Sequence, residues 1–205
     1  LYEVSPDLSG ESALVLPRGE HILAPGSYSA DGRTLVYTEL NSRTLGDLWI
    51  VSLADGSVTP LLRSPANERS PTFSPDGQWL AFASDESGID HVYVQAFPGP
   101  GPTIRISPDG GREPVWSRDG SELFYRYGDA MMAVPVSTEG SFAAGPPVRL
   151  FQDRYAPEYK GRSNYDVDPD GRFLMVEVQE GSGPLRLDVI LNWFDELQDL
   201  LPVSE

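Results

Sequence analysis

Ser74-Pro75-Asp76-Gly77 is the clearest copy of a four-residue phrase that occurs four times in this chain. The other copies are Ser29-Ala30-Asp31-Gly32, Ser117-Arg118-Asp119-Gly120 and Asp168-Pro169-Asp170-Gly171. Proline presets the first central position of a type I turn, aspartate suits the second, and glycine takes the left-handed position that follows. Such a turn joins two antiparallel strands as a hairpin with a bulge. The phrase therefore predicts four β-hairpins.

The residues around each turn extend this prediction to a repeat. Each turn follows an aromatic or apolar residue, namely Tyr28, Phe73, Trp116 or Val167. Each turn also precedes a strand-like run, at 34–38, 78–83, 122–126 and 172–176. The turn aspartates lie 45, 43 and 51 residues apart, and such periods with several strands per unit are typical of propeller blades. We therefore expect an all-β protein, a β-propeller with blades of four antiparallel strands.

The order of the strand-like runs predicts a single propeller segment over 1–205, a partial ring of about four blades. Residues 1–24 are expected to form the outer half of a blade, and 163–193 an incomplete blade IV. Blades I, II and III are expected at 25–64, 65–108 and 109–152. A longer loop, 152–162, accounts for the 51-residue period. At the end, apolar residues at helical spacing predict a short helix over 194–201.

Composition excludes several classes of function. The 205 residues carry a formal net charge of −16, which repels nucleic acid and anionic lipid surfaces. The chain has no cysteine, so it holds no disulfide, thiolate zinc site or cysteine nucleophile. It also lacks an apolar run of about 18 residues and a charged-then-apolar leader, so we expect this segment neither to insert into a membrane nor to carry its own export signal.

One group of charged residues is a candidate binding site. Arg69 and Arg112 stand five residues before a turn serine, where the chain enters the inner strand of a blade. Glu68 and Glu113 are their neighbours, and Arg162 lies near the corresponding place in blade IV. Because ligand sites favour the mouths of closed β structures, these residues form a candidate ligand or partner rim. The alternative is that the charges pair with one another around a solvated rim.

A second candidate is a calcium-like motif. Asp166, Asp168 and Asp170, with Gly171 and Glu177, satisfy the spacing of an EF-hand loop. That loop gathers its oxygens between two helices, whereas this segment aligns with three strand–turn–strand copies. We therefore interpret it as a turn, expect no bound metal or cofactor, and retain the three aspartates only as a weak calcium candidate.

Catalytic motifs are absent from the sequence. There is no G-x-S-x-G elbow for a nucleophilic serine, and no glycine-rich loop of the kinds that bind phosphates. The chain has two histidines, His21 in an expected loop and His91 at the start of an expected strand. We therefore expect that the chain is not an enzyme.

The repeated Ser-Pro-Asp-Gly hairpins resemble those of the TolB-like, WD-repeat-like β-propellers of bacteria. The ending Asp188-Val-Ile-Leu-Asn-Trp-Phe-Asp-Glu-Leu197 resembles the C-terminus of propellers that follow a transmembrane segment in some bacterial serine/threonine protein kinases. Asp168 departs from the pattern, since the other three copies carry serine. The chain has no kinase domain, so the resemblance carries over no catalytic residue.

The resemblance implies a non-catalytic scaffold for protein interaction or ligand sensing. It would be the extracytoplasmic part of a receptor-like kinase, on the extracytoplasmic or periplasmic side of a bacterial membrane, or a subunit of a larger complex; the cytoplasm is the alternative location. The alternative function is the substrate-gating propeller of a prolyl-oligopeptidase-like serine hydrolase whose catalytic domain lies outside this chain. Since the predicted ring is incomplete, we expect a protein partner or second copy to cover the opening.

Overall fold

A computed structural model describes residues 1–3, 13–17, 19, 21–99, 101–152, 155–156, 158, 161–177 and 187–190. Every regular element in this part of the chain is a β-strand. Accordingly, these residues include no helix that is long and apolar enough to cross a membrane. The helix expected over 194–201 lies outside the described residues.

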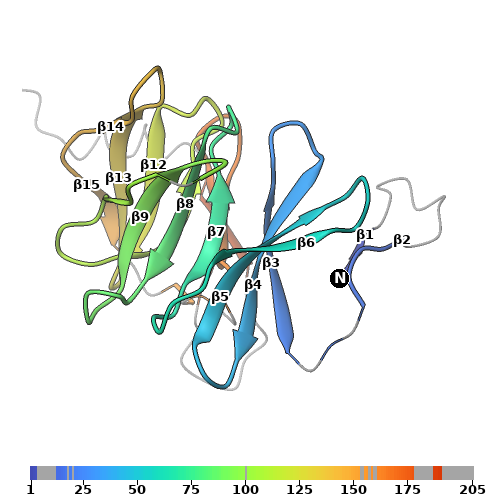
Figure 1. The fold of residues 1–205 in the computed structure, drawn as a ribbon. Helices are drawn as coiled ribbons and strands as arrows, with labels where there is room; N and C mark the ends of the chain where they lie inside the picture. Colours follow the sequence, from blue (N-terminus) through green and yellow to red (C-terminus); the bar gives the residue numbers. More distant parts are fainter. Residues whose placement is uncertain are drawn as a thin grey trace, which may run out of the picture.

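The strands form antiparallel sheets in chain order (Figure 1). Blade I contains β3 (Ile22–Tyr28), β4 (Thr34–Asn41), β5 (Leu45–Ser52) and β6 (Val58–Leu62). Blade II contains β7 (Arg69–Phe73), β8 (Trp79–Ser84), β9 (His91–Ala96) and β10 (Ile104–Arg105). Blade III contains β11 (Arg112–Trp116), β12 (Glu122–Tyr127), β13 (Ala130–Ser137), β14 (Ala143–Ala144) and β15 (Val148–Gln152). Blade IV contains β16 (Tyr165–Val167), β17 (Phe173–Val176) and β18 (Leu187–Ile190), and a separate pair contains β1 (Tyr2–Glu3) and β2 (Ala13–Leu14).

The four predicted hairpins are present, and each turn glycine has a left-handed backbone. The φ angles of Gly32, Gly77, Gly120 and Gly171 are 67°, 71°, 74° and 78°. In the three serine copies, the serine hydroxyl donates to the turn aspartate at 2.5–2.7 Å. The same hydroxyl accepts the amide five residues later at 2.9–3.0 Å, so it closes the hairpin from within. In the fourth copy Asp168 accepts the Arg172 amide, four residues later, at 2.9 Å.

Blade III differs from the others at its outer edge. Strand β13 pairs with β15 over Ala130–Ala133 and with β14 at Val136 and Ser137. Pro135 lies between these two pairings and opposite Glu122 of β12. Proline cannot donate to a ladder, so its position at the change of partner explains how the strand tolerates it.

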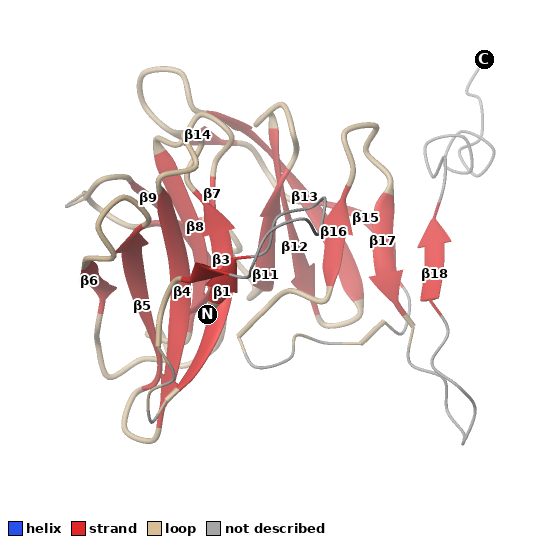
Figure 2. Cartoon of the chain, turned by 90° about the vertical axis from the view of Figure 1, so that its right-hand side faces the viewer, coloured by secondary structure: helices blue, strands red, loops and turns tan. Residues whose placement is uncertain are grey.

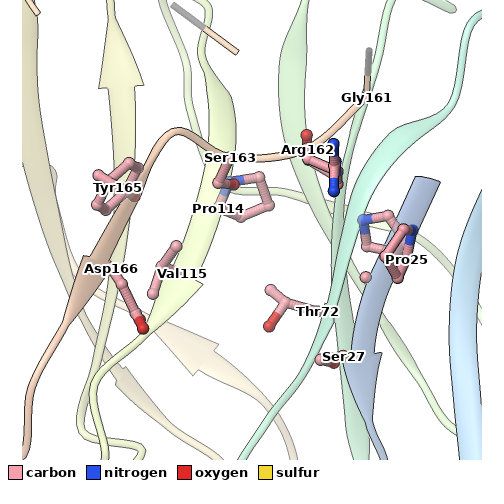
Figure 3. Close-up of a pocket in the computed structure, with 13 residues that line it drawn as sticks. Pro25, Ser27, Thr72, Pro114, Val115, Gly161, Arg162, Ser163, Tyr165 and Asp166 are labelled. Carbon is pink, nitrogen blue, oxygen red and sulfur yellow. The ribbon is translucent and has the colours of Figure 1, made fainter. Parts of the chain in front are cut away.

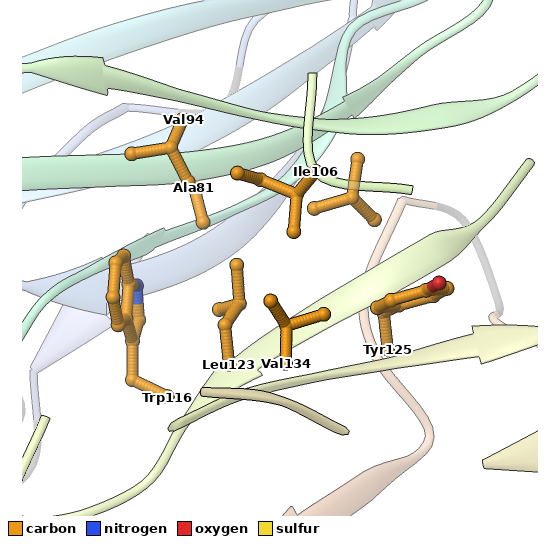
Figure 4. Packing of buried hydrophobic residues seen from close by; sticks show 8 residues of the cluster. Ala81, Val94, Ile106, Trp116, Leu123, Tyr125 and Val134 are labelled. Atoms are coloured by element: carbon orange, nitrogen blue, oxygen red, sulfur yellow. The ribbon is translucent and has the colours of Figure 1, made fainter. Parts of the chain in front are cut away.

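The core consists of apolar layers between consecutive blades. One layer, between blades II and III, contains Ala81, Val94, Trp116, Leu123 and Val134 (Figure 4). Similar layers lie between blades I and II and between blades III and IV. Blade I also packs on its other side, against residues next to the β1–β2 pair. Thus each described blade is stabilised mainly by its neighbours, as expected for a repeat fold.

The first strands of the blades lie together at the centre. Strand β7 contacts β3 and β11, and β11 contacts β16. Figure 2 shows the blades following one another, from the β3–β6 sheet on the left to the β16–β18 sheet on the right. Together, the sheets and the turns establish a β-propeller architecture, as predicted from the sequence.

Candidate functional site

A cavity of about 490 Å³ lies between the first strands of the four blades (Figure 3). We call it the axial cavity. Its walls come from β3, β7 and β11, and from the chain at 161–166. Ser27, Thr72 and Ser163 supply hydroxyl groups, while Arg162 and Asp166 supply charge. The cavity is therefore polar on several sides, and it could hold a hydrogen-bonding ligand or a segment of another chain.

Three first strands have a register shift beside this cavity, and the one in β3 lies between Pro25 and Tyr28. The pairing register shifts between Arg69 and Thr72 in β7, and between Arg112 and Val115 in β11. Ser70 and Glu113 take the left-handed conformation there, with φ angles of 52° and 58°. This conformation costs a non-glycine residue on the order of 1 kcal/mol, so the surrounding contacts must hold both residues in place.

Those contacts come from a segment between β15 and β16 that we call the roof, the described residues 155, 156, 158 and 161–164. The Ser70 amide donates to the Gly161 carbonyl at 3.1 Å, and the Ser70 hydroxyl donates to Glu158 Oε2 at 3.0 Å. A Cβ built on Gly161 would lie 3.5 Å from Thr38 of blade I and 3.7 Å from Arg69 of blade II. The roof therefore reaches across neighbouring blades at one end of the axial cavity.

Arg69 is the cationic anchor of the roof. Its side chain is buried, its Nη2 lies 2.6 Å from Asp90 Oδ2, and its Nε pairs with Glu158. Burial disfavours the charged guanidinium, but the Glu158 and Asp90 carboxylates outweigh burial and raise the pKa of Arg69. This arginine therefore stays charged and joins the roof to the β8–β9 loop.

Glu113 is the anionic anchor, with no exposed surface. Its Oε1 accepts the Glu158 amide and its Oε2 accepts the Asn164 amide, both at 3.0 Å. Arg126 Nη1 lies 3.8 Å from Oε1. Burial raises the pKa of Glu113 even though the Asn164 amide and Arg126 act in the opposite direction. Each carboxylate oxygen of Glu113 thus accepts a hydrogen bond from the roof backbone.

The other three predicted rim residues occupy different surroundings. Glu68 is buried, and its Oε1 accepts from the Ser64 hydroxyl, while its Oε2 has no hydrogen-bond partner among the described residues. Burial raises the pKa of Glu68. Arg112 is partly exposed, with Nε 4.0 Å from Asp90 Oδ2. Arg162 is exposed and lines the axial cavity.

The structure thus brings together part of the predicted rim. Arg69 and Arg112 share Asp90, and Arg69 and Glu113 share Glu158. Arg69 and Glu113 are buried rather than solvated, and their charged groups bond to residues outside the predicted set. Glu158 was not singled out from the sequence. The one signal for it was the long spacing before the fourth turn, which marked the 152–162 loop but not its role.

The calcium-like residues form a turn held by an arginine. Asp168 Oδ1 accepts the amides of Asp170 and Arg172 at 2.9 Å, and Oδ2 pairs with the Arg172 guanidinium. Arg172 Nη2 also lies 3.2 Å from Asp170 Oδ2. Glu177 follows the far end of β17, so it does not share a loop with the turn. Among the described residues, no three histidine, cysteine or acidic side chains group in a way that could hold a metal ion.

A family model and several known proteins match parts of this chain. A family model, the TolB beta propeller domain, matches residues 7–141. The Tol-Pal system protein TolB of Francisella tularensis subsp. mediasiatica is 31% identical over 96 residues, covering 46% of this chain and 22% of that protein. The uncharacterized peptidase YuxL of Bacillus subtilis is 30% identical over 171 residues, covering 75% and 24%. The chain thus spans about a quarter of the length of these relatives.

Among solved structures, the crystal structure of TolB from Acinetobacter baumannii superposes with a TM-score of 0.66. The likeness covers 92% of this chain and 44% of that chain, at 17% identity. At that identity the superposition concerns the fold alone.

Proposed function

Because this chain belongs to the TolB β-propeller domain family, we propose that it is a non-catalytic scaffold whose axial cavity binds a protein segment or a small polar ligand. The observation that carries this proposal is the cavity itself, about 490 Å³ in volume and lined by hydroxyl groups beneath the roof. The cavity takes its walls from several blades, so a ligand there would be held by the scaffold as a whole.

A cavity-filling variant tests the proposal. Ser163→Trp would occupy the space, whereas Ser121→Trp, in the blade III hairpin, leaves it open. We expect a partner cross-linked to the parent protein in its own cell extract, and identified by mass spectrometry, to be lost with Ser163→Trp and kept with Ser121→Trp. Equal capture by both variants would show that the axial cavity is not the binding site.

The proposed setting is the extracytoplasmic side of a bacterial membrane, as the sensing or docking part of a receptor-like kinase or as a subunit of a larger complex. The absence of cysteine from the sequence suits an oxidising compartment. The resemblance of residues 188–197 to the C-terminus of kinase-linked propellers supports the receptor arrangement.

The second candidate is the gating propeller of a serine hydrolase. It is favoured by the match to YuxL, a relative described as a peptidase, over 75% of this chain. The coding sequence on either side separates the two candidates. A kinase domain and a membrane span in the same gene support the first candidate, and an α/β-hydrolase domain with a G-x-S-x-G elbow supports the second.

A further inference from the structure

Two buried side chains of blade III bind the backbone of the roof. Glu113 accepts the amides of Glu158 and Asn164, while Arg126 donates to the carbonyls of Tyr155 and Ala156. Both side chains are at most 5% exposed. Water therefore competes poorly for these hydrogen bonds, and the roof cannot shift without leaving a buried charged group unsatisfied.

Glu113 contributes more to this arrangement than Arg126, because its two bonds span the stretch that faces the axial cavity. The Glu113 carboxylate oxygens accept the amide of Glu158 on one side of that stretch and the amide of Asn164 on the other, each at an N···O distance of 3.0 Å. Between these two amides lie Gly161, Arg162 and Ser163, which line the cavity. The Glu113 main-chain carbonyl also accepts the Tyr165 hydroxyl at 2.7 Å.

The bulge explains why this residue can reach the roof. Glu113 has a φ of 58°, and the register of β11 shifts at this point. In blade II, Ser70 has the same left-handed backbone at the corresponding place, and it too bonds to the roof, through Gly161 and Glu158. Two blades thus accept backbone strain at the position from which a side chain meets the roof, which indicates that the roof contact is built into both.

We propose that Glu113 is the positioning residue of the axial cavity: it fixes the roof at Glu158 and at Asn164 and so sets how wide a ligand can enter past Arg162. The part of this proposal that concerns ligand entry rests on the proposed function, because it treats the cavity as a binding site. The effect of the Glu113 carboxylate on the position of the roof can be measured with no ligand at all.

A single cysteine in the cavity measures access. The chain has no cysteine, and the Thr72 side chain lies among the cavity-lining residues (Figure 3), so Thr72→Cys supplies one thiol. Its rate of reaction is followed with a small reagent, iodoacetamide, and a bulky one, fluorescein maleimide. Glu113→Gln keeps the size of the side chain but replaces one acceptor oxygen with an NH₂ group that faces an amide donor.

With Glu113→Gln we expect the bulky reagent to react at least about fivefold faster, and the small reagent to be affected less. Amide hydrogen exchange at residues 158 and 161–164 should rise about tenfold or more, because the roof opens locally. The matched control is Glu122→Gln on β12, a glutamate on the next strand that makes no roof contact among the described residues. It should leave both rates unchanged.

Low concentrations of urea separate a local opening from general loss of stability. If Glu113 positions the roof, the faster labelling in the variant stays constant over the urea range in which the protein remains folded. If Glu113 merely stabilises the fold, labelling increases steadily with urea, and the proposal is overturned. Unchanged labelling and exchange in a folded Glu113→Gln protein overturn it equally.

Ser70→Ala is the second variant, for use where Glu113→Gln does not fold. It removes the Ser70 hydroxyl bond to Glu158 and leaves the backbone contact with Gly161 in place. It should raise the bulky-reagent rate in the same direction by a smaller factor, and no change would count against a fixed roof. None of these measurements uses a ligand, so their failure is distinguishable from failure of the proposed binding function.

Discussion

At the scale of single residues, the turn serine shows how a short sequence determines local structure. Ser74 donates to Asp76 at 2.5 Å and accepts the Trp79 amide at 3.0 Å, so one hydroxyl satisfies two groups of the hairpin. Ser29 makes the same two bonds in blade I, but it is less buried. The two serines therefore make the same two hydrogen bonds but differ in how far they are buried.

We predict that Ser74→Ala lowers the free energy of unfolding by about 1–3 kcal/mol, because the part-buried Trp79 amide loses an acceptor on a residue that is only 1% exposed. Ser29→Ala should cost about 1 kcal/mol or less, since water can replace the hydroxyl. Urea denaturation of both variants measures the difference. Equal losses would show that burial does not determine the contribution of the turn serine.

The pH dependence of stability gives a second prediction at this scale. Burial raises the pKa of Glu68 above its usual 4.5, so the folded chain binds this proton more tightly than the unfolded chain does. The stabilisation from protonated Glu68 is therefore complete below about pH 4.5, and it is lost as the pH rises through the raised pKa. Glu68→Gln should gain stability relative to the parent protein over this range.

Urea unfolding at several pH values from 4.5 to 7 tests that prediction. The pKa values of Asp31, Asp76 and Asp119 are lowered from their usual 3.8 and so lie below this window; for Asp31 the main cause is the hydrogen bond from the Ser29 hydroxyl. Exposed Glu86→Gln is the control and should follow the parent protein. A constant difference between Glu68→Gln and the parent across the window would contradict the assignment.

At the scale of elements, the interfaces between blades carry the apolar core. Leu123 of β12 is completely buried in the layer between blades II and III. Val148 of β15, in the same blade, is 55% exposed. We predict that Leu123→Ala costs about 2–5 kcal/mol, because it leaves a cavity in a packed layer. Val148→Ala should change stability by about 0.5 kcal/mol or less, and thermal or urea unfolding compares the two.

The sequence predicts elements whose causes are local. Each Asp-Gly turn and the strand after it depend on residues within a few positions of one another, so hairpins such as 73–79 were predictable. The roof could not be predicted in the same way. Glu158 meets Glu113 from 45 residues away and Ser70 from 88 residues away, and no periodicity reports such contacts. The sequence therefore singled out Arg69 and Glu113, but not the segment that buries them.

At the scale of the whole molecule, each blade has two faces, and the two faces of blade IV differ. Phe173 and Met175 of β17 are buried against blade III. Leu174, between them, lies on the opposite face with Asp166 as its cross-strand partner, and it is 41% exposed. In blade I, Tyr28 of β3 is paired with Leu35, which faces away from blade II, and Tyr28 is 47% exposed. In a closed propeller an adjacent blade would cover surfaces of this kind.

The last prediction follows from these two faces. Exposed apolar side chains on a sheet face favour association, so the 205 residues expressed alone should form a concentration-dependent dimer or higher oligomer, or bind a protein that covers the opening. Light scattering after size exclusion measures the mass over a range of concentrations. Leu174→Lys should shift the segment toward monomer because it places a charge on the exposed face of blade IV. Ile89→Lys, at a more exposed loop residue of blade II, should not. A compact, cooperatively melting monomer at every concentration, indifferent to Leu174→Lys, would refute the idea, because it would show that four blades in an open arrangement are stable without a partner.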